Sequence, residues 1–267
     1  MKLTLDLHVH SDASFDGRMS VRQIALLAKA RGIDGVAICD HDVVYTGPTE
    51  VEGVLIIPGA EFSTEYGHLL GLFLTAPIQH TTWKETVQAI HDQGGITVLA
   101  HPYQNKRSGS LEPFRPILDD IDAVETWNSR ANRKYPHAND NAFIMALMRN
   151  KLSTGGSDAH VPQEVGRGFL TVDVEERTLA AVKAQILGGY KPEGGRYWGH
   201  GKPSSARYVA SSQRTKLRKA HAGAGAYAKW GLFSLNCLRQ DAARTLRELK
   251  QKLPARLPKE LREIEKE

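Results

Sequence analysis

Short apolar, β-branched runs alternate with helix-like stretches along the first 190 residues, and this alternation limits the possible folds more than any other feature. The predicted strands cover residues 2–9, 34–41, 54–61, 68–74, 95–101, 121–127 and 152–158. Helical patterns cover residues 20–32, 82–95, 137–150 and 175–189, with Ser20 as the expected N-cap of the first. Strand–helix alternation of this length favours an α/β fold with a largely parallel sheet, open or closed into a barrel.

The charge balance changes near residue 190, which marks the expected domain boundary. Residues 1–190 carry 17 Lys and Arg against 23 Asp and Glu, whereas residues 191–267 carry 18 against 7. We therefore expect an acidic domain at 1–190 and a basic, mostly helical C-terminal extension at 191–267. The leucine stripe within residues 231–253 predicts an amphipathic helix in this extension.

Two roles are open for the extension. The amphipathic helix is expected to pack on the first domain or on a second copy of the chain, which would form a homo-oligomer. The alternative is that its basic neighbours attract nucleic acid or another polyanion such as acidic lipid.

The cellular setting follows from what the composition excludes. Hydrophobic residues make up 41% and charged residues 24% of the chain, as in ordinary globular proteins. No apolar run approaches the roughly 20 residues that a membrane-spanning helix needs, so we expect no transmembrane segment. Polar residues begin at Asp6, which excludes a signal peptide at this start, and Cys39 and Cys237 are far apart. These features predict a cytoplasmic protein without a disulfide framework.

Histidines, carboxylates and one asparagine follow the ends of most predicted strands. They are His8, His10, Asp40, His41, Asp42, Glu61, His101, Glu125, Asn128, Asp158 and His160. The carboxyl ends of parallel strands meet at one rim, where α/β proteins build their sites. Buried carboxylates need compensation, and imidazole and carboxylate ligands without thiolate suit Zn²⁺, Mn²⁺ or Fe²⁺. The pattern therefore predicts a site for two or three divalent cations, although a single histidine is more often structural.

Five motifs, read in order, resemble one family. "DLHVHSDASFDG", "CDHD", "GAEFS", "AHP" and "GSDAH" are similar to the motifs of the polymerase and histidinol phosphatase (PHP) family of metal-dependent phosphoesterases. The resemblance covers about residues 3–170 and implies a distorted (β/α)7 barrel with up to three metal ions at its C-terminal mouth. It assigns the first ion to His8, His10, Glu61 and Asp158. Glu61 then bridges to a second ion at His101, and the third ion binds Asp16, His41 and His160.

Several positions stay open within this resemblance. Either Glu125 or Asn128 completes the second metal site, with Glu125 preferred. Asp12 is an alternative to Asp16, because the spacing after His10 is one residue longer than in some family members. The remaining pair, Asp40 and Asp42, either orients imidazoles or forms turns.

Basic residues after the strands are candidates for holding a phosphate group. They are Arg167, Arg130, Arg133 and Lys134, and His68 is grouped with them as a substrate-binding candidate. Metal ions activate water for attack on phosphorus. Asp158 or His160 is the candidate for protonating the leaving group, and Arg167 is the cation best placed for catalysis. An ordinary solvated charge is the alternative for each basic residue.

These observations predict a metal-dependent phosphoesterase that hydrolyses a nucleotide, sugar phosphate or amino-alcohol phosphate. Glu61 and His101 are only 40 positions apart, which leaves no room for the cap of some nucleotide-specific family members and favours an open mouth. One alternative is a nuclease or oligonucleotide phosphodiesterase whose basic extension holds nucleic acid. A second is a metal-binding scaffold without catalysis.

Overall fold

The computed structural model describes residues 1–79, 82–104, 112–134 and 137–188. The expected boundary at residue 190 and the basic extension therefore lie outside the described residues. None of the described helices is long and apolar enough to cross a membrane.

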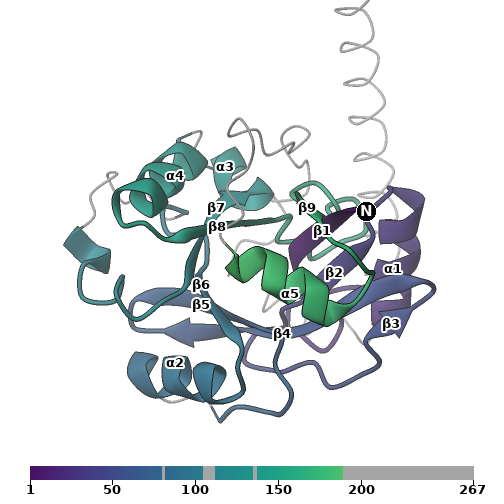
Figure 1. The fold of residues 1–267 in the computed structure, drawn as a ribbon, viewed down its shortest axis with the longest axis horizontal. Coiled ribbons are helices and arrows are strands. Elements are labelled where there is room, and N and C mark those ends of the chain that lie inside the picture. The colour runs from purple at the N-terminus through teal and green to yellow at the C-terminus, as the bar shows by residue number, and fades with distance from the viewer. Residues whose placement is uncertain (80–81, 105–111, 135–136, 189–267) are drawn as a thin grey trace, which may run out of the picture. The chain divides into compact units, whose positions relative to one another are not determined.

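The centre of the fold is one sheet of nine strands (Figure 1). The strands are β1 (Lys2–Val9), β2 (Gly35–Ile38), β3 (Glu50–Val51), β4 (Val54–Thr64), β5 (Gly67–Leu72), β6 (Ile96–Leu99), β7 (Ala123–Asn128), β8 (Leu152–Gly156) and β9 (Leu170–Asp173). They are ordered β8-β7-β6-β5-β4-β2-β1-β9, with β3 added beside β4. All seven predicted strands are present, and the sequence analysis missed β3 and β9.

The strand directions explain how the rim forms. β1, β2 and β4 pair in parallel, and so do β6, β7 and β8. β5 is antiparallel to both β4 and β6, so the two parallel groups run in the same direction. The carboxyl ends of six strands and the amino end of β5 therefore lie on the same rim.

The sheet closes almost completely between β8 and β1. Val9 and Ala159 form a parallel bridge, and the Asp158 amide donates a hydrogen bond of 2.8 Å to the His8 carbonyl. Gly156 makes this approach possible, because a β-carbon there would lie 2.4 Å from Cβ of His8. The expected distorted α/β barrel is confirmed, with β3, β5 and β9 as its antiparallel members.

Helices cover the sheet on several sides (Figure 1). They are α1 (Val21–Ala30), α2 (Trp83–Asp92), α3 (Ser129–Lys134), α4 (Ala138–Met148) and α5 (Leu179–Leu187), with a 3-10 turn at Glu112–Phe114. The four longer helices were predicted. Ser20 caps α1 as expected and forms a capping box with Gln23, whereas the six-residue α3 was not anticipated.

Apolar side chains on both faces of the strands form the core. Ile24 and Ala28 of α1 pack with Ile38 of β2 on one face. On the other face, Leu5 belongs to the same cluster as Val182 of α5, which lies across the sheet (Figure 1). Burial on both faces makes the strands rigid supports for the side chains at the rim.

Candidate metal centre

Nine imidazole and carboxylate side chains meet at this rim. They are His8, His10, Asp16, His41, Glu61, His68, His101, Asp158 and His160, and they form four overlapping groups whose ligand atoms lie within 4.8 Å of one another. All are buried or nearly so except His68, whose side chain is 36% exposed. The structure thus brings together eight of the nine side chains that the sequence selected as metal ligands, and Glu125 is the exception.

We divide these donors into three groups, and the first, made of His8, His10, Asp158 and Oε2 of Glu61, has the spacing of a metal site. Nε2 of His8 and Nε2 of His10 are 3.1 Å apart, and Oε2 of Glu61 lies 3.4 and 3.2 Å from them. Oδ1 of Asp158 lies 3.8 and 3.5 Å from the same two nitrogens. Four ligands at about 2.1 Å from one ion in tetrahedral geometry stand about 3.4 Å apart, so these donors fit a transition-metal cation.

The second group uses the other oxygen of Glu61. Its Oε1 lies 2.7 Å from Nδ1 of His68 and 2.9 Å from Nε2 of His101. One carboxylate therefore faces two groups of imidazoles, the arrangement that a bridging ligand needs. His68, and not Glu125 or Asn128, lies beside Glu61 in this group. The sequence analysis placed His68 among substrate-binding residues because it did not anticipate the reversed direction of β5.

The third group contains two acceptors that face each other. Nδ1 of His160 lies 2.9 Å from the Asp158 carbonyl, so this nitrogen carries the proton and Nε2 presents a lone pair. Nε2 has no hydrogen-bond partner among the described residues and lies 2.9 Å from Oδ2 of Asp16. Nε2 of His41 lies 3.7 Å from the same oxygen. A cation between these atoms satisfies all three, so the donor set fits a metal ion here as well.

Proton affinities at the site show strong coupling between the groups. Burial alone lowers the pKa of His10, yet its hydrogen bonds to Asp158 and Glu61 raise that pKa to about 9. Burial likewise opposes ionisation of Glu61, but His68 and His8 hold its pKa well below the usual range. Burial and the nearby Arg130 lower the pKa of His160, which keeps this imidazole neutral. The carboxylates are thus ionised and ready to accept cations.

Irregular backbone places several of these side chains. His101 has φ 28° and Asp158 has φ 56°, in the left-handed region that non-glycine residues rarely adopt. The pairing register shifts in β1 between Asp6 and Val9, next to His8. Such strain and bulges concentrate at functional sites, where they redirect side chains.

Glu125 and Asn128, the two candidates for completing the second metal site, do not belong to the clustered donors and have hydrogen-bond partners elsewhere. Oε1 of Glu125 lies 3.0 Å from Nδ1 of His8, and its Oε2 accepts from the His101 amide at 2.9 Å. Nδ2 of Asn128 donates to that same Oε2 at 3.0 Å, while its Oδ1 accepts from the Ala131 amide at 2.7 Å. The two side chains therefore contact His8 Nδ1 and backbone amides, and neither points into the space between the metal-type donor atoms.

Asp16, rather than the exposed Asp12, joins His41 and His160. Asp40 accepts hydrogen bonds of 2.6 Å from the amide and the hydroxyl of Ser11. Asp42 lies at φ 57° in a turn and accepts a 3.0 Å bond from the Ser63 amide. Asp40 thus stabilises the loop after β1, and Asp42 has the backbone of a turn former.

Of the basic residues expected to bind phosphate, Arg130 is buried and has a nitrogen without a hydrogen-bond partner among the described residues. Its Nη2 lies 3.2 Å from Oε2 of Glu164, and its Nε has no hydrogen-bond partner among the described residues. Glu164 also accepts a 2.9 Å bond from the His160 amide. Arg167 is buried, and its Nε donates to the Gln163 carbonyl. The side chains of Arg133 and Lys134 in α3 lie outside the described part of the chain.

Sequence reasoning missed two further residues at the site. Glu164 connects Arg130 to His160, but it lies in a loop and follows no strand, so no pattern marked it. Phe15 stacks on the ring of His41 with centroids 4.9 Å apart, and it is 39% exposed. Its position inside the "DASFDG" motif was the available signal.

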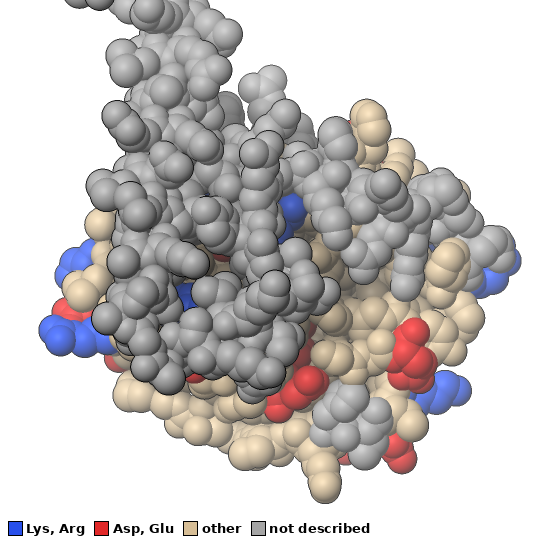
Figure 2. Space-filling model, turned by 180° about the vertical axis from the view of Figure 1, so that it is seen from behind, with Lys and Arg blue, Asp and Glu red and all other residues tan. Residues whose placement is uncertain are grey.

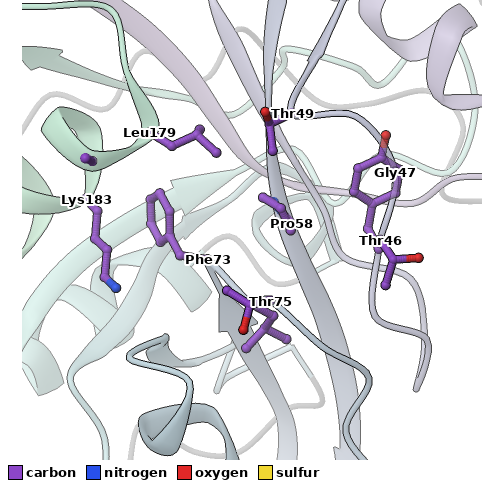
Figure 3. A pocket seen from close by; sticks show the side chains of 11 residues that line it. Thr46, Gly47, Thr49, Pro58, Phe73, Thr75, Leu179 and Lys183 are labelled. Carbon is purple, nitrogen blue, oxygen red and sulfur yellow. The ribbon is translucent and has the colours of Figure 1, made fainter.

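The structure also has a cavity of about 420 Å³ away from this cluster (Figure 3). Its lining includes Thr46, Pro58, Phe73, Thr75 and Lys183 and none of the nine clustered side chains. A smaller hollow of about 90 Å³ adjoins the cluster and is lined in part by Tyr66, His68 and His101. The larger cavity therefore lies apart from the chemistry of the site.

A nearly closed α/β barrel with clustered imidazoles and carboxylates at one rim defines a metal-dependent hydrolase. Comparison with protein families agrees with this class. The PHP domain model matches residues 6–100, and the PHP-associated model matches residues 136–189. The chain belongs to the PHP family of metal-dependent phosphoesterases.

Two curated relatives illustrate the family. An uncharacterized protein of Methanocaldococcus jannaschii is 33% identical over 176 residues, which cover 63% of this chain and 70% of the relative. A protein named probable phosphatase, from Acetivibrio thermocellus, is 26% identical over 204 residues, covering 62% of this chain and 83% of the relative.

Two solved structures share the fold. A two-domain protein of Bacteroides vulgatus containing a predicted PHP-like metal-dependent phosphoesterase has a TM-score of 0.56 at 20% identity. The match covers 70% of this chain and 63% of that chain, which is less than two thirds of its length. Endonuclease Q bound to a 27-mer duplex with an abasic lesion has a TM-score of 0.52 at 20% identity, over 70% of this chain and 57% of its own. At this identity the likeness concerns the fold alone.

Proposed function

We propose that the chain hydrolyses a phosphate monoester of a small metabolite with the help of two or three divalent cations. The observation that carries the proposal is the donor geometry, in which the first group has metal-ligand spacing and His160 directs a lone pair at Asp16. Divalent cations at such donors supply a water-derived nucleophile at neutral pH and neutralise charge on the phosphate oxygens. Zn²⁺, Mn²⁺ and Fe²⁺ are the candidates, because the ligands are imidazoles and carboxylates.

The side chains divide the work of holding the cations. In the proposed arrangement His8, His10 and Asp158 surround the first position. Glu61, whose Oε2 lies near His8 and His10 and whose Oε1 lies near His68 and His101, connects it to the second. Asp16, His41 and His160 provide the third position, next to His10. Neutral His160 acts as a ligand in this arrangement. We therefore assign cation binding, and not proton transfer, as the main role of Asp158 and His160.

Arg130 is the residue we assign to phosphate binding. Burial disfavours the guanidinium charge, but Glu164, Asp158 and Asp16 together raise the pKa of Arg130, so it stays cationic. Glu164 pairs with Nη2 of the Arg130 guanidinium, and Nε of that guanidinium has no hydrogen-bond partner among the described residues. A phosphate oxygen supplies the missing acceptor, and charge-assisted bonds of this type are strong and directional.

We favour a small substrate with a terminal phosphate because the donors are mostly buried. His68 is the most exposed of the nine clustered side chains, at 36%, and Phe15, which stacks on His41, is 39% exposed. A terminal phosphate reaches buried donors more readily than a phosphate between two nucleosides does.

Turnover of p-nitrophenyl phosphate tests the proposal. We expect activity that chelation abolishes and that Mn²⁺, Zn²⁺ or Fe²⁺ restores, followed by a panel of nucleotide, sugar and amino-alcohol phosphates. Asp158→Asn and His10→Ala should each lower kcat by orders of magnitude while the circular dichroism spectrum stays unchanged. Arg22→Gln, at an exposed pair with Glu52, is the control. Near-normal turnover in either site variant contradicts the ligand assignment.

A nuclease is the second candidate, and the charge of the extension favours it. Residues 191–267 carry 18 Lys and Arg against 7 Asp and Glu. Where side chains of the described residues are visible in Figure 2, acidic and basic ones are interspersed. If only oligonucleotides are hydrolysed, and p-nitrophenyl phosphate is not, this candidate replaces the first.

A further inference from the structure

Glu125 lies between two of the donor groups without belonging to either. The residue is 1% exposed in β7, at a point where the pairing of β7 with β8 shifts register. Its Oε1 contacts Nδ1 of His8, and its Oε2 accepts from the backbone amide of His101. Glu125 therefore contacts one ligand of the first group through its ring and one ligand of the second group through its backbone.

The contact with His8 determines which ring nitrogen carries the proton. Oε2 of Glu125 already accepts from two N–H groups, and an imidazole nitrogen is a stronger base than a carboxylate oxygen, so the proton in the 3.0 Å contact belongs to Nδ1 of His8. When a cation is bound, Nε2 is then the nitrogen with the lone pair. That atom faces His10, Glu61 and Asp158 at 3.1, 3.4 and 3.8 Å.

The contact with His101 supports a strained backbone. His101 has φ 28°, a conformation that needs stabilisation from its surroundings. Its amide donates to Oε2 of Glu125 at 2.9 Å, and its ring reaches Glu61 at 2.9 Å. The carboxylate of Glu125 thus holds the amide of a residue whose ring belongs to the second group.

Asn128 determines how Glu125 itself is placed. The Oδ1 of Asn128 accepts from the amide of Ala131 at 2.7 Å, which orients the side-chain amide. Its Nδ2 then donates to Oε2 of Glu125 at 3.0 Å. Oε2 therefore receives two donors and Oε1 receives one.

We infer that Glu125 is a positioning residue that fixes the His8 tautomer and the His101 backbone, and so couples the first and second metal positions. This inference rests on the proposed function, because it concerns how the proposed cations are held. It replaces the expectation that Glu125 is itself a ligand. Carboxylates in this relation to a ligating histidine commonly change metal affinity 10–100-fold, so we expect about that effect from the loss of Glu125.

Glu125→Gln makes a specific prediction because a glutamine has one acceptor oxygen. Two donors already face the Oε2 position, so the glutamine oxygen is favoured there and its NH₂ faces His8. Nδ1 of His8 must then accept, and the proton moves to Nε2, where it blocks the cation. The variant has nearly the same shape as the wild type, yet it presents the wrong tautomer.

The experiment compares the zinc-loaded full chain with its Glu125→Gln variant. We expect about 10–100-fold weaker zinc binding at one position, by competition with a chromogenic chelator. In ¹⁵N-histidine spectra, His8 should carry its proton on Nδ1 in the wild type and on Nε2 in the variant. His160 is the internal reference, because its Nδ1 bonds to a backbone carbonyl that the substitution leaves in place.

Two further variants serve as controls. Glu125→Asp keeps an anionic acceptor, so it should keep the Nδ1 proton and recover part of the zinc affinity. Asp122→Asn removes a carboxylate that contacts another histidine, His91, at 3.0 Å outside the donor groups. We expect this control to bind zinc as the wild type does.

Several results would overturn the inference. Unchanged zinc affinity and an unchanged His8 tautomer in Glu125→Gln would do so. If that variant fails to fold, the wild type alone decides, because coordination of zinc through Nδ1 of His8 also contradicts the inference. A wild type that binds no zinc and hydrolyses no phosphate ester refutes the proposed function instead.

Discussion

At the scale of single residues, His68 and His91 show how neighbours decide the role of a histidine. Each has a carboxylate partner, Glu61 at 2.7 Å and Asp122 at 3.0 Å, and each side chain is about one third exposed. The difference is that Glu61 also faces four other imidazoles, whereas Asp122 is occupied by the amide and hydroxyl of Thr97. His68 therefore belongs to a metal-type cluster and His91 to a local hydrogen-bond network.

This contrast gives the first prediction. His68→Ala should weaken zinc binding at the second position by at least about tenfold and reduce turnover, because one of its imidazole donors is lost. Its effect on the free energy of unfolding should be small, since the side chain is partly exposed. His91→Ala is the matched control and should keep the full zinc content. Elemental analysis and p-nitrophenyl phosphate turnover provide the measurements, and a full zinc content in His68→Ala contradicts the assignment.

The pH dependence of metal uptake is the second prediction. Without cations, hydrogen bonds to Asp158 and Glu61 outweigh burial and raise the pKa of His10 to about 9, so below this pH the ring holds a proton that a cation must displace. Affinity should therefore rise with pH below about pH 9, by about tenfold per unit for each proton released. Calorimetry in buffers of different ionisation enthalpy reports the protons. Affinity that is constant between pH 6 and 8 would contradict this.

At the scale of elements, the strands and longer helices were predictable because each has a regular apolar pattern. The direction of β5 was not recognised, although the signal was present. Only residues 65–66 separate β4 from β5, and a parallel connection needs a dozen residues or more. The six-residue α3 and the two-residue β3 carry too few residues for a period to show, whereas β9 was missed although it is as long as β2 and β6.

The site was predictable to a different extent. Seven of the clustered side chains stood out because histidines and carboxylates at strand ends are conspicuous, and Asp16 was added by the resemblance to the PHP motifs. The contacts of Glu125 and Glu164 were not predictable, since their partners come from β1, the segment after β6 and α3, and only the fold brings these together. Sequence patterns identify residue types at a rim, whereas hydrogen-bond partners depend on tertiary structure.

The third prediction concerns the start of α1. Ser20 and Gln23 form a capping box, so Ser20→Ala removes the hydrogen bond to a free amide at the helix end. We expect a loss of about 1 kcal/mol in the free energy of unfolding, measured by urea denaturation. Turnover should stay unchanged, because Ser20 is not among the clustered donors. A stability equal to the wild type would show that the cap contributes nothing here.

At the scale of the whole molecule, residues 1–190 carry more acidic than basic side chains, whereas residues 191–267, which lie outside the described part of the chain, carry 18 Lys and Arg against 7 Asp and Glu. Charge of one sign concentrated in one segment produces binding that depends steeply on salt. The fourth prediction is that the full chain is retained on heparin and elutes earlier as salt rises. Retention should fall, with p-nitrophenyl phosphate turnover unchanged, when glutamine replaces four basic residues: Arg214, Lys216, Arg218 and Lys219. Elution independent of salt would contradict a polyanion role.

The near closure of the sheet between β8 and β1 has a consequence for the thermal stability of the protein. His8 and His10 come from the beginning of the chain, while Asp158 and His160 follow β8, and the two pairs share donor groups across this seam. A cation held there cross-links β1 to the residues that follow β8. Loading with zinc should therefore raise the thermal unfolding midpoint, and the seam should be the first place to open when the ion is withdrawn.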